Sequence, residues 1–376
     1  MRSRKKGILM VLLLSMTVIS ACKGETKSPE ALSPGPLLSP GYAVNDPGRL
    51  QEREQIERFV RTRMMGTDGI YTNFKDTEQK AEVATGHELL SESSSLYMRT
   101  AARTAEKKEF DEAWTSARKT FEQDWGFSYR YSPKWKKRFP VGASVDELRL
   151  LRALYEAGEV FQDPTYTKEA DQLGERFVRY HVRDGKLRDF YDSTAGVTNG
   201  FLTLCYADMR TLWQFPATVE PKKLVEDTLA TVEGGYLSDS FPFYETRYNY
   251  ETQRYESEGI RTVESLLTIL HLTEMGREKD TSIRFIKERL ADGALYGEYS
   301  RTGEPMNRVE STAIYALVGM IAAERDDPTL YNMAVERMEA YRVTKESSAL
   351  FGGFGNDQLD EAYSFDNLMA LLAYTY

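Results

Sequence analysis

The chain has 376 residues, a formal net charge of −9 and many aromatic side chains, with 23 Tyr, 17 Phe and 4 Trp. The negative charge argues against nucleic acid or anionic lipid headgroups as the main partner. Three His and two Cys are too few to favour a zinc site. No phosphate loop or nucleotide-binding fingerprint appears in the sequence, so it predicts no metal and no cofactor.

The N-terminal sequence has the pattern of an export signal. Basic residues open the chain, and residues 8–19 form a mostly apolar run that is too short to span a bilayer comfortably. The run ends in Ile19-Ser20-Ala21-Cys22, and small residues before a lone Cys resemble the bacterial lipobox. The resemblance implies a signal peptide over residues 1–21 and diacylglycerol and palmitoyl groups on Cys22, which would hold the protein at the outer face of the cell membrane. The alternatives are an ordinary secretory signal with an incidental Cys and an uncleaved anchor helix.

Residues 22–48 contain several prolines among Ser and Gly and show no apolar periodicity. This composition predicts an extended tether that holds the folded part, residues 49–376, away from the membrane.

From residue 51 onward the pattern is helical and alternates between two kinds of segment. Six amphipathic segments have charged outer faces, at 52–65, 106–121, 165–180, 220–233, 281–291 and 328–341. Six others are richer in small and apolar residues and should be buried, at 92–102, 145–157, 199–212, 260–275, 310–323 and 364–374. The buried kind recurs about every 50 to 60 residues, which indicates a repeated unit.

Six hairpins of one inner and one outer helix predict an all-α fold, the (α/α)6 barrel. The alternative is an open helical solenoid. Closure is favoured because the last segment is as apolar as the middle ones, whereas a terminal solenoid repeat needs a polar capping face.

The loops that lead into the inner helices are long and aromatic, and residues 247–255 suggest a short β-hairpin at the active-site end. Aromatic rings with Arg, Asp and Glu at one open end suit a carbohydrate. The alternative is that these rings pack the loops onto the barrel. The candidate stacking residues are Tyr131, Trp135, Tyr191, Tyr244 and Tyr248.

Acidic residues stand at or near the starts of several inner helices, namely Glu92, Asp146, Glu147, Glu258, Glu310 and Asp366. In a closed barrel they would converge on the open end, where two carboxylates flanking a water are the arrangement for inverting glycoside hydrolysis. The alternative is that they only complement helix dipoles.

The surrounding motifs point to a family. Leu90-Ser91-Glu92-Ser93-Ser94-Ser95, followed by Phe110-Asp111-Glu112-Ala113-Trp114, resembles the first signature of glycoside hydrolase family 8. Ala143-Ser144-Val145-Asp146-Glu147 resembles the second signature, and Glu258-Gly259-Ile260-Arg261 is similar to the Tyr-Asp-Ala-x-Arg segment of that family. Together with the lipobox and the Pro-rich stretch, they look most like the YdaJ-like lipoproteins of Bacillus, which are encoded beside exopolysaccharide synthesis genes.

The resemblance implies roles for these residues. It places the general acid on Glu92, the base on Glu258 and an acidic residue under the sugar on Asp146 or Glu147, with Arg261 orienting carboxylates or substrate. Tyr97 and Asp366 are further candidates for binding the sugar. The first Asp of the second signature is absent at Val145, and the base position holds Glu in place of Asp, so Glu310 and Asp192 stay in reserve as bases.

The function expected from the resemblance is an extracytoplasmic endo-glycosidase, inverting, that acts on a β-1,4-type exopolysaccharide during its production, export or release. The protein would be a monomer with the polysaccharide as substrate and the synthesis machinery as a candidate partner. The departures from the motifs motivate a rival, a glycan-binding or assembly lipoprotein that has lost catalysis. A second rival is an (α/α)6 lyase.

Overall fold

A computed structural model describes residues 32, 34–39, 41, 47–80 and 83–376. Residues Met1–Leu32 and Ser33–Tyr376 form separate units, and the description concerns the second. The predicted signal peptide and Cys22 lie outside the described residues, so their prediction is not tested here. Among the described helices, none combines the length and the apolar character needed to cross a bilayer.

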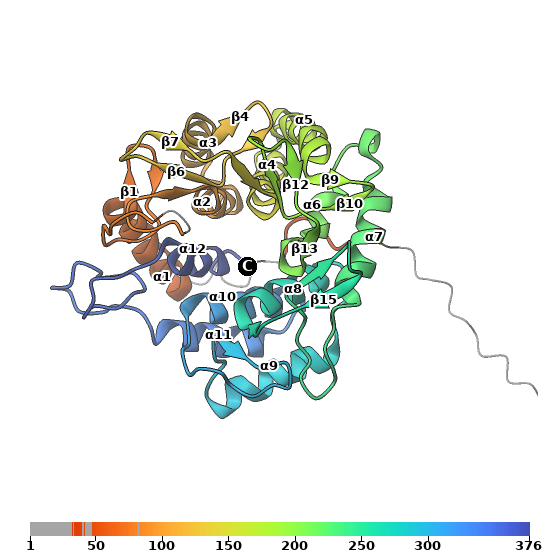
Figure 1. Ribbon diagram of the computed structural model, residues 1–376. Helices are drawn as coiled ribbons and strands as arrows, with labels where there is room; N and C mark the ends of the chain where they lie inside the picture. Colours follow the sequence, from red (N-terminus) through yellow and green to blue (C-terminus); the bar gives the residue numbers. More distant parts are fainter. Residues whose placement is uncertain (1–31, 33, 40, 42–46, 81–82) are drawn as a thin grey trace, which may run out of the picture. The chain divides into compact units, whose positions relative to one another are not determined.

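Inner and outer helices alternate along the chain and are arranged in a ring, with the outer helices on the periphery (Figure 1). The outer helices are α1 (Pro47–Phe59) with its continuation η1 (Val60–Met64), α3 (Lys107–Phe121), α5 (Pro164–His181), α7 (Pro221–Glu233), α9 (Asp280–Asp292) and α11 (Pro328–Glu339). The inner helices are α2 (Ser91–Arg103), α4 (Ser144–Val160), α6 (Met209–Trp213) with the preceding turn η2 (Leu204–Tyr206), α8 (Thr262–Glu274), α10 (Thr312–Glu324) and α12 (Ser364–Ala373).

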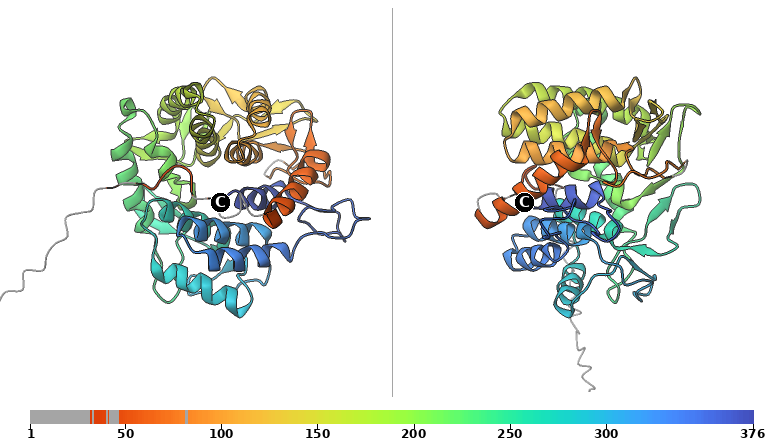
Figure 2. Two further views of the ribbon diagram at one scale, coloured as in Figure 1. Left: turned by 180° about the vertical axis from the view of Figure 1, so that it is seen from behind. Right: turned by 90° about the vertical axis from the view of Figure 1, so that its left-hand side faces the viewer.

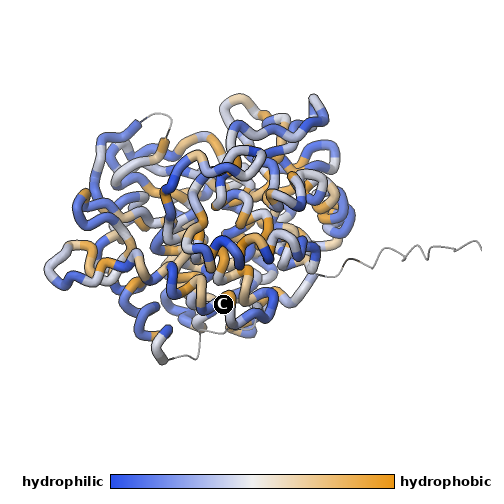
Figure 3. Tube along the Cα trace, turned by 90° about the horizontal axis from the view of Figure 1, so that it is seen from below, coloured by the Kyte–Doolittle hydropathy of each residue, from blue (hydrophilic) through white to orange (hydrophobic). Residues whose placement is uncertain are grey.

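The ring of inner helices is closed. Each inner helix packs against the next in chain order, and α12 packs against α2. The predicted (α/α)6 barrel is therefore confirmed, and the open solenoid is wrong. The chemistry of the helices explains the layering, because α10 is buried along almost its whole length while α5 buries a single stripe. Figure 3 shows hydrophobic segments running through the interior and hydrophilic segments at the periphery.

The third inner element differs from the expectation. In place of one helix over 199–212, the chain forms strand β13 (Phe201–Thr203), the turn η2 and the short helix α6. Asp208 ends the irregular stretch, because its side chain accepts a hydrogen bond from the backbone N–H of Thr211 and so starts α6 there. The inner ring is thus interrupted at its third position.

Short strands fill the loops at one end of the ring, the end at which most inner helices begin. The side view in Figure 2 shows β14 and β15 at this end and the C-terminus at the opposite end. The predicted hairpin at 247–255 is confirmed as β14 (Arg247–Asn249) and β15 (Arg254–Glu256), with β13 paired to β14.

The other strands form small antiparallel sheets that the sequence pattern did not predict. They are β1 (Met65–Gly66), β2 (Gly69–Ile70), β3 (Leu89–Leu90), β4 (Glu122–Gln123), β5 (Gly126–Phe127), β6 (Arg130–Ser132), β7 (Lys137–Arg138), β8 (Val141–Ala143), β9 (Val182–Arg183), β10 (Lys186–Leu187), β11 (Phe190–Asp192), β12 (Val197–Thr198), β16 (Ile260–Arg261) and β17 (Glu298–Tyr299).

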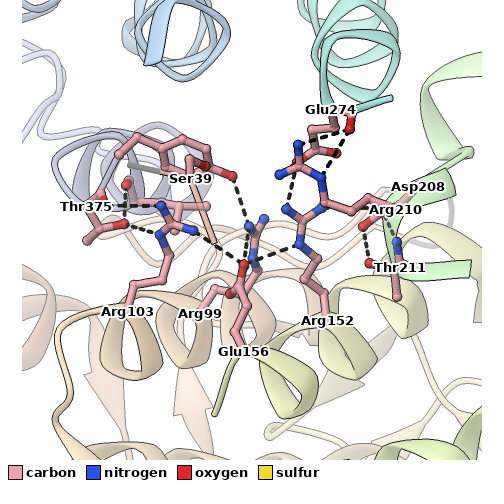
Figure 4. Close-up of polar contacts among 12 residues, drawn as sticks. Ser39, Arg99, Arg103, Arg152, Glu156, Asp208, Arg210, Thr211, Glu274 and Thr375 are labelled. Atoms are coloured by element: carbon pink, nitrogen blue, oxygen red, sulfur yellow. Dashed lines mark hydrogen bonds and ion pairs between the residues drawn. The ribbon is translucent and has the colours of Figure 1, made fainter. Parts of the chain in front are cut away.

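The opposite end of the ring is filled by a buried network of arginines and carboxylates (Figure 4). Glu156 accepts hydrogen bonds from Arg99 and Arg152, and Arg103 lies 3.6 Å from the same carboxylate. Arg152 also binds Glu274, with a distance of 2.7 Å between Nη2 and Oε1. The side chains of Arg99, Arg103, Arg152 and Glu156 are at most 8% exposed, so the network lies inside the barrel.

Residues 34–39 lie against this network, which corrects part of the expected tether. The backbone N–H of Gly35 donates to the carbonyl of Glu274, and the hydroxyl of Ser39 donates to Glu324. Leu37 and Ser39 are buried at 8% and 9% exposure. Since burial of an apolar side chain favours docking, residues 34–39 pack onto the barrel and do not form an extended tether. For the rest of residues 22–48, the tether stays a prediction.

Candidate active site

A pocket of about 510 Å³ opens at the end of the ring where the inner helices begin. Its walls come from α2, α4, η2, α8 and α12 together with adjoining loops. The lining residues are Val83, Ala84, Leu90, Glu92, Tyr129, Ala143, Val145, Asp146, Arg149, Thr203, Cys205, Tyr206, Thr246, Val263, Glu264, Leu267 and Phe365. We refer to this pocket as the central pocket.

Two carboxylates and one arginine form a cluster on one wall. Glu92 lies in the first turn of α2 and Asp146 in the first turn of α4. Arg149 Nη1 donates to Glu92 Oε2 at 2.9 Å and to Asp146 Oδ1 at 3.5 Å. Burial, and then the nearby charge of Glu92, raise the pKa of Asp146 to about 7. The cluster therefore holds an acid that is partly protonated near neutral pH, as proton donation requires.

Glu264 supplies a carboxylate from another part of the ring. It lies in the first turn of α8, which is three inner positions away from α2. Its Oε1 accepts a hydrogen bond from Arg261 at 3.3 Å, its Oε2 is buried, and the side chain of Thr246 lies close enough to act on its pKa. Burial raises its pKa. A carboxylate in the lining of a pocket, with its pKa raised by burial, is suited to take a proton from a water molecule.

Glu258 lies in a neighbouring pocket of about 480 Å³, which shares Thr246 and Glu264 with the central pocket. Glu258 is exposed and precedes strand β16, whereas Glu264 lies inside α8. Of these two residues, Glu264 lines the central pocket and Glu258 does not, so Glu258 as the base stays a prediction. Arg261 pairs with Glu264, although its side chain is 72% exposed.

Three other acidic candidates are placed away from the central pocket. Glu147 is buried against the outer layer, where it accepts the N–H of Phe127 and lies 3.4 Å from His181. Glu310 is held by Tyr315 and Arg337, so its pKa is lowered despite partial burial. Asp192 accepts backbone N–H groups of its own turn. None of the three is among the residues that line the central pocket, so their catalytic roles stay predictions.

Asp366 and Tyr97 also lie outside the lining of the central pocket. Asp366 accepts the backbone N–H of Ala313 and so satisfies the start of α10. Tyr97 is buried and lines a smaller pocket of about 190 Å³ between α2, α3 and the β1–β2 hairpin. Burial raises the pKa of Tyr97 to about 12, so the phenol is neutral near pH 7.

The aromatic candidates mostly pack the loops onto the barrel. The ring of Tyr191 packs at a tilt against the rings of Trp125 and Tyr180, and the ring centroids of Tyr248 and Tyr255 lie 4.8 Å apart. Tyr244 is almost fully buried. Tyr131 lies in β6, and Trp135, which is 50% exposed, lies in the β6–β7 turn. None of these five lines the central pocket, whose aromatic side chains are Tyr129, Tyr206 and Phe365.

Sequence reasoning missed Arg149, Glu264 and the pocket aromatics. A usable signal was present for two of them, because Glu264 repeats the position of Glu92 and Asp146 in a first helical turn. Arg149 follows Asp146 by three residues, a spacing that places both on one face of α4. The positions of Tyr206 and Thr203 follow from the interruption of the third inner helix, which no local pattern indicated.

One further cluster has a spacing that could suit a metal. Asp208, His271 and Glu274 present ligand atoms within 4.8 Å of one another at the closed end. Their oxygens are already used, because Asp208 accepts from Arg152 and Thr211 and Glu274 accepts from Arg152 and His271. Two arginines contact this cluster, so its arrangement is that of an ion-pair network.

Comparison with solved structures identifies the class of fold. A family 8 xylanase from Teredinibacter turnerae superposes with a TM-score of 0.65 at 12% identity, covering 88% of this chain and 93% of that one. PssZ from Listeria monocytogenes superposes with a TM-score of 0.67 at 19% identity, covering 92% of this chain and 97% of PssZ. These likenesses show the glycoside hydrolase family 8 fold.

A novel alpha-amylase from Clostridium perfringens is more similar in sequence. It is 30% identical, with a TM-score of 0.80, and the match covers 86% of this chain and 97% of the amylase. The chain therefore belongs to the family of this amylase, a family of glycoside hydrolases, and the resemblance to glycoside hydrolase family 8 is confirmed.

Among curated proteins, the putative lipoprotein YdaJ of Bacillus subtilis (strain 168) is 24% identical over 240 residues. The match covers 62% of this chain and 64% of YdaJ, so it spans less than two thirds of that relative. No family model matches the chain.

Proposed function

We propose that this protein is an inverting endo-glycosidase that hydrolyses a β-linked polysaccharide in the central pocket. The observation that carries the proposal is that carboxylates from separate inner helices face one pocket. The Glu92–Asp146 pair supplies the proton donor, and Glu264 is the base that activates water from the other wall. Family membership and the raised pKa of Asp146 support this assignment.

The reaction needs a protonated donor and an ionised base at the same pH. The donor pair holds a proton near neutral pH, and Arg149 compensates the remaining negative charge. Protonation of the glycosidic oxygen makes the departing sugar a better leaving group, while Glu264 takes a proton from the attacking water. Tyr129, Tyr206 and Phe365 offer ring faces on which sugar rings can stack.

An α-1,4-glucan is the second candidate substrate. It is favoured by the amylase, which is 30% identical to this chain, whereas the xylanase is 12% identical. The experiment is a reducing-sugar assay of the purified protein on soluble starch, β-1,4-glucan, chitosan and poly-N-acetylglucosamine, with proton NMR to follow the anomer released. Release from a β-linked glycan as the α-anomer supports the proposal, and release from starch selects the second candidate. Binding without any hydrolysis would favour the rival, a glycan-binding lipoprotein that has lost catalysis.

We further propose that the enzyme is anchored by a lipid on Cys22 at the outer face of the membrane and acts on an exopolysaccharide. The lipobox-like residues 19–22 and the relative described as a putative lipoprotein support this. Changing Cys22 to Ser should move the protein from the membrane fraction to the soluble fraction. Retention in the membrane fraction would contradict the lipid anchor.

A further inference from the structure

Arg149 occupies a position in the site that the family motifs do not mark. It lies on α4, one turn after Asp146, and its side chain is 10% exposed. A single nitrogen, Nη1, contacts both carboxylates of the donor pair, at 2.9 Å from Glu92 and 3.5 Å from Asp146. Glu92 is the more exposed carboxylate, at 23% of its side chain against 9% for Asp146.

The charged and titratable groups around this pair come from several elements. Cys205 and Tyr206 of η2 face it, and burial raises the pKa of both, so they are neutral near pH 7. Glu264 of α8 and Asp189, which precedes β11, are near enough for their negative charges to raise the pKa of Cys205 further. Among the groups that act on Asp146, Arg149 is the one that lowers its pKa by its charge, whereas Glu92 raises it.

These charges balance in one protonation state. With one proton on the pair, the remaining carboxylate and the guanidinium form a neutral unit in a buried wall. With no proton, a net negative charge is left in a poorly solvated place, and with two protons the buried guanidinium loses its partner. The arginine therefore favours the state in which the pair carries a single proton.

We propose that Arg149 is a positioning residue that keeps the Glu92–Asp146 pair singly protonated and holds the Glu92 carboxylate at the pocket wall. The proposal rests on the proposed function, since it concerns the proton donor of the same site. Because the two carboxylates interact, their two ionisations belong to the pair and not to either residue alone.

The consequence is a displacement of the pH–rate profile when the charge is removed. Without the cation, each carboxyl of the pair loses its proton only at a higher pH. The alkaline limb of the pH–rate profile, where the donor loses its proton, therefore moves to higher pH. A residue with only a packing role would lower the rate at every pH and leave the limbs in place. Arg149→Lys keeps the charge and should restore the profile.

The test measures kcat/KM of the full chain from about pH 4 to about pH 9 for the wild type, Arg149→Met and Arg149→Lys. We expect the alkaline limb of Arg149→Met to lie about one pH unit higher or more, with kcat lowered about tenfold and KM changed less. Arg337→Met is the matched control, because Arg337 pairs with Glu310 away from the pocket, and its profile should equal that of the wild type. An unmoved limb in Arg149→Met would overturn the proposal.

A second measurement separates this inference from the proposed function and from misfolding. Thermal unfolding of the same variants is followed over the same pH range, together with Glu92→Gln/Arg149→Met, which removes both charges of the closer contact. If the wild type hydrolyses no glycan, the proposed function fails. In that case Tm alone tests the inference. The pH at which ionisation of Asp146 changes Tm should be higher in Arg149→Met than in the wild type. If it does not rise, Arg149 does not set the protonation state.

Discussion

Glu264 and Glu258 lie close in sequence, but their surroundings differ. Glu264 has a buried oxygen at the wall of the central pocket, whereas Glu258 is exposed at the neighbouring pocket. We expect Glu264→Gln to lower kcat by roughly a thousandfold, because the amide cannot take a proton from water, and Glu258→Gln to lower it by less than about fivefold. The measurement is kcat on the glycan that the reducing-sugar assay selects. A larger loss of kcat in Glu258→Gln than in Glu264→Gln would identify Glu258 as the base.

The sequence could place Glu92 at the pocket better than it could place Glu264. Ser91-Glu92 opens α2 directly, so the motif and the helix start coincide. At the base side the chain first forms strand β16, which pairs with β17 far along the sequence, and α8 begins only at Thr262. A residue pattern carries no information on such a long-range pairing, so the sequence could not place Glu264 at the central pocket.

Asp146 should lower the free energy of unfolding at pH values at which its carboxyl is ionised. Its pKa is raised from 3.8 to about 7, so the folded state binds the proton more tightly than the unfolded state. The resulting stabilisation is fully present below about pH 4 and is lost as the pH rises through about 7. We therefore expect Asp146→Asn to raise the free energy of unfolding at pH 8 by roughly 1–2 kcal/mol relative to the wild type, while activity falls at least about a hundredfold.

Chemical unfolding at pH 8 and at pH 5, with activity measured in parallel, checks this expectation. The gain at pH 5 should be much smaller, because the wild-type side chain is then largely protonated. Lower stability of Asp146→Asn at pH 8 would show that the ionised carboxylate is fully compensated by Arg149.

At the scale of elements, the third inner position shows what periodicity cannot reveal. The segment 199–212 has the apolar content of an inner helix, but Phe201–Thr203 pairs with Arg247–Asn249 in a sheet. Asp189 fixes this strand, since its carboxylate accepts both the N–H and the hydroxyl of Thr203. The interruption brings Thr203, Cys205 and Tyr206 to the central pocket, so the deviation from the repeat is part of the site.

The docked segment 34–39 makes a prediction about stability. Leu37 is 8% exposed, whereas its neighbour Leu38 is only partly buried. Leu37→Ala should lower the free energy of unfolding by about 2 kcal/mol, because it leaves a gap under the segment, and Leu38→Ala should cost less than about 1 kcal/mol. Urea unfolding of the full chain measures both. Equal, small effects would mean that the segment behaves as a tether after all.

At the scale of the whole molecule, the two ends of the ring differ in the number of cations around their carboxylates. At the open end, carboxylates face a pocket with few cations, and the pKa of Asp146 is raised. At the closed end, arginines surround the carboxylates, and the pKa values of Glu156 and Glu274 are lowered by Arg99, Arg152 and Arg210. The alternation of helices could be predicted from the sequence. The charge network could not, because its members come from α2, α4, α6, α8 and α10 and meet only when the ring closes.

This network should govern the acid stability of the molecule. A carboxylate whose pKa is lower in the folded state stabilises the fold above its unfolded value of about 4.5, and this stabilisation is lost as the pH falls toward the folded value. The wild type should therefore lose stability steeply below about pH 4.5.

Glu156→Gln tests the network directly. The change leaves Arg99, Arg103 and Arg152 without the carboxylate that they share, so we expect a loss of about 3–5 kcal/mol at pH 7 and a flatter decline of stability in acid. Glu233→Gln is the control, since the Glu233–Arg277 pair is exposed and should contribute less than about 1 kcal/mol. Thermal unfolding of the three proteins between pH 3 and pH 8 gives both quantities. A Glu156→Gln protein that is as stable as the wild type at pH 7 would show that the buried arginines do not need this carboxylate to hold the ring closed.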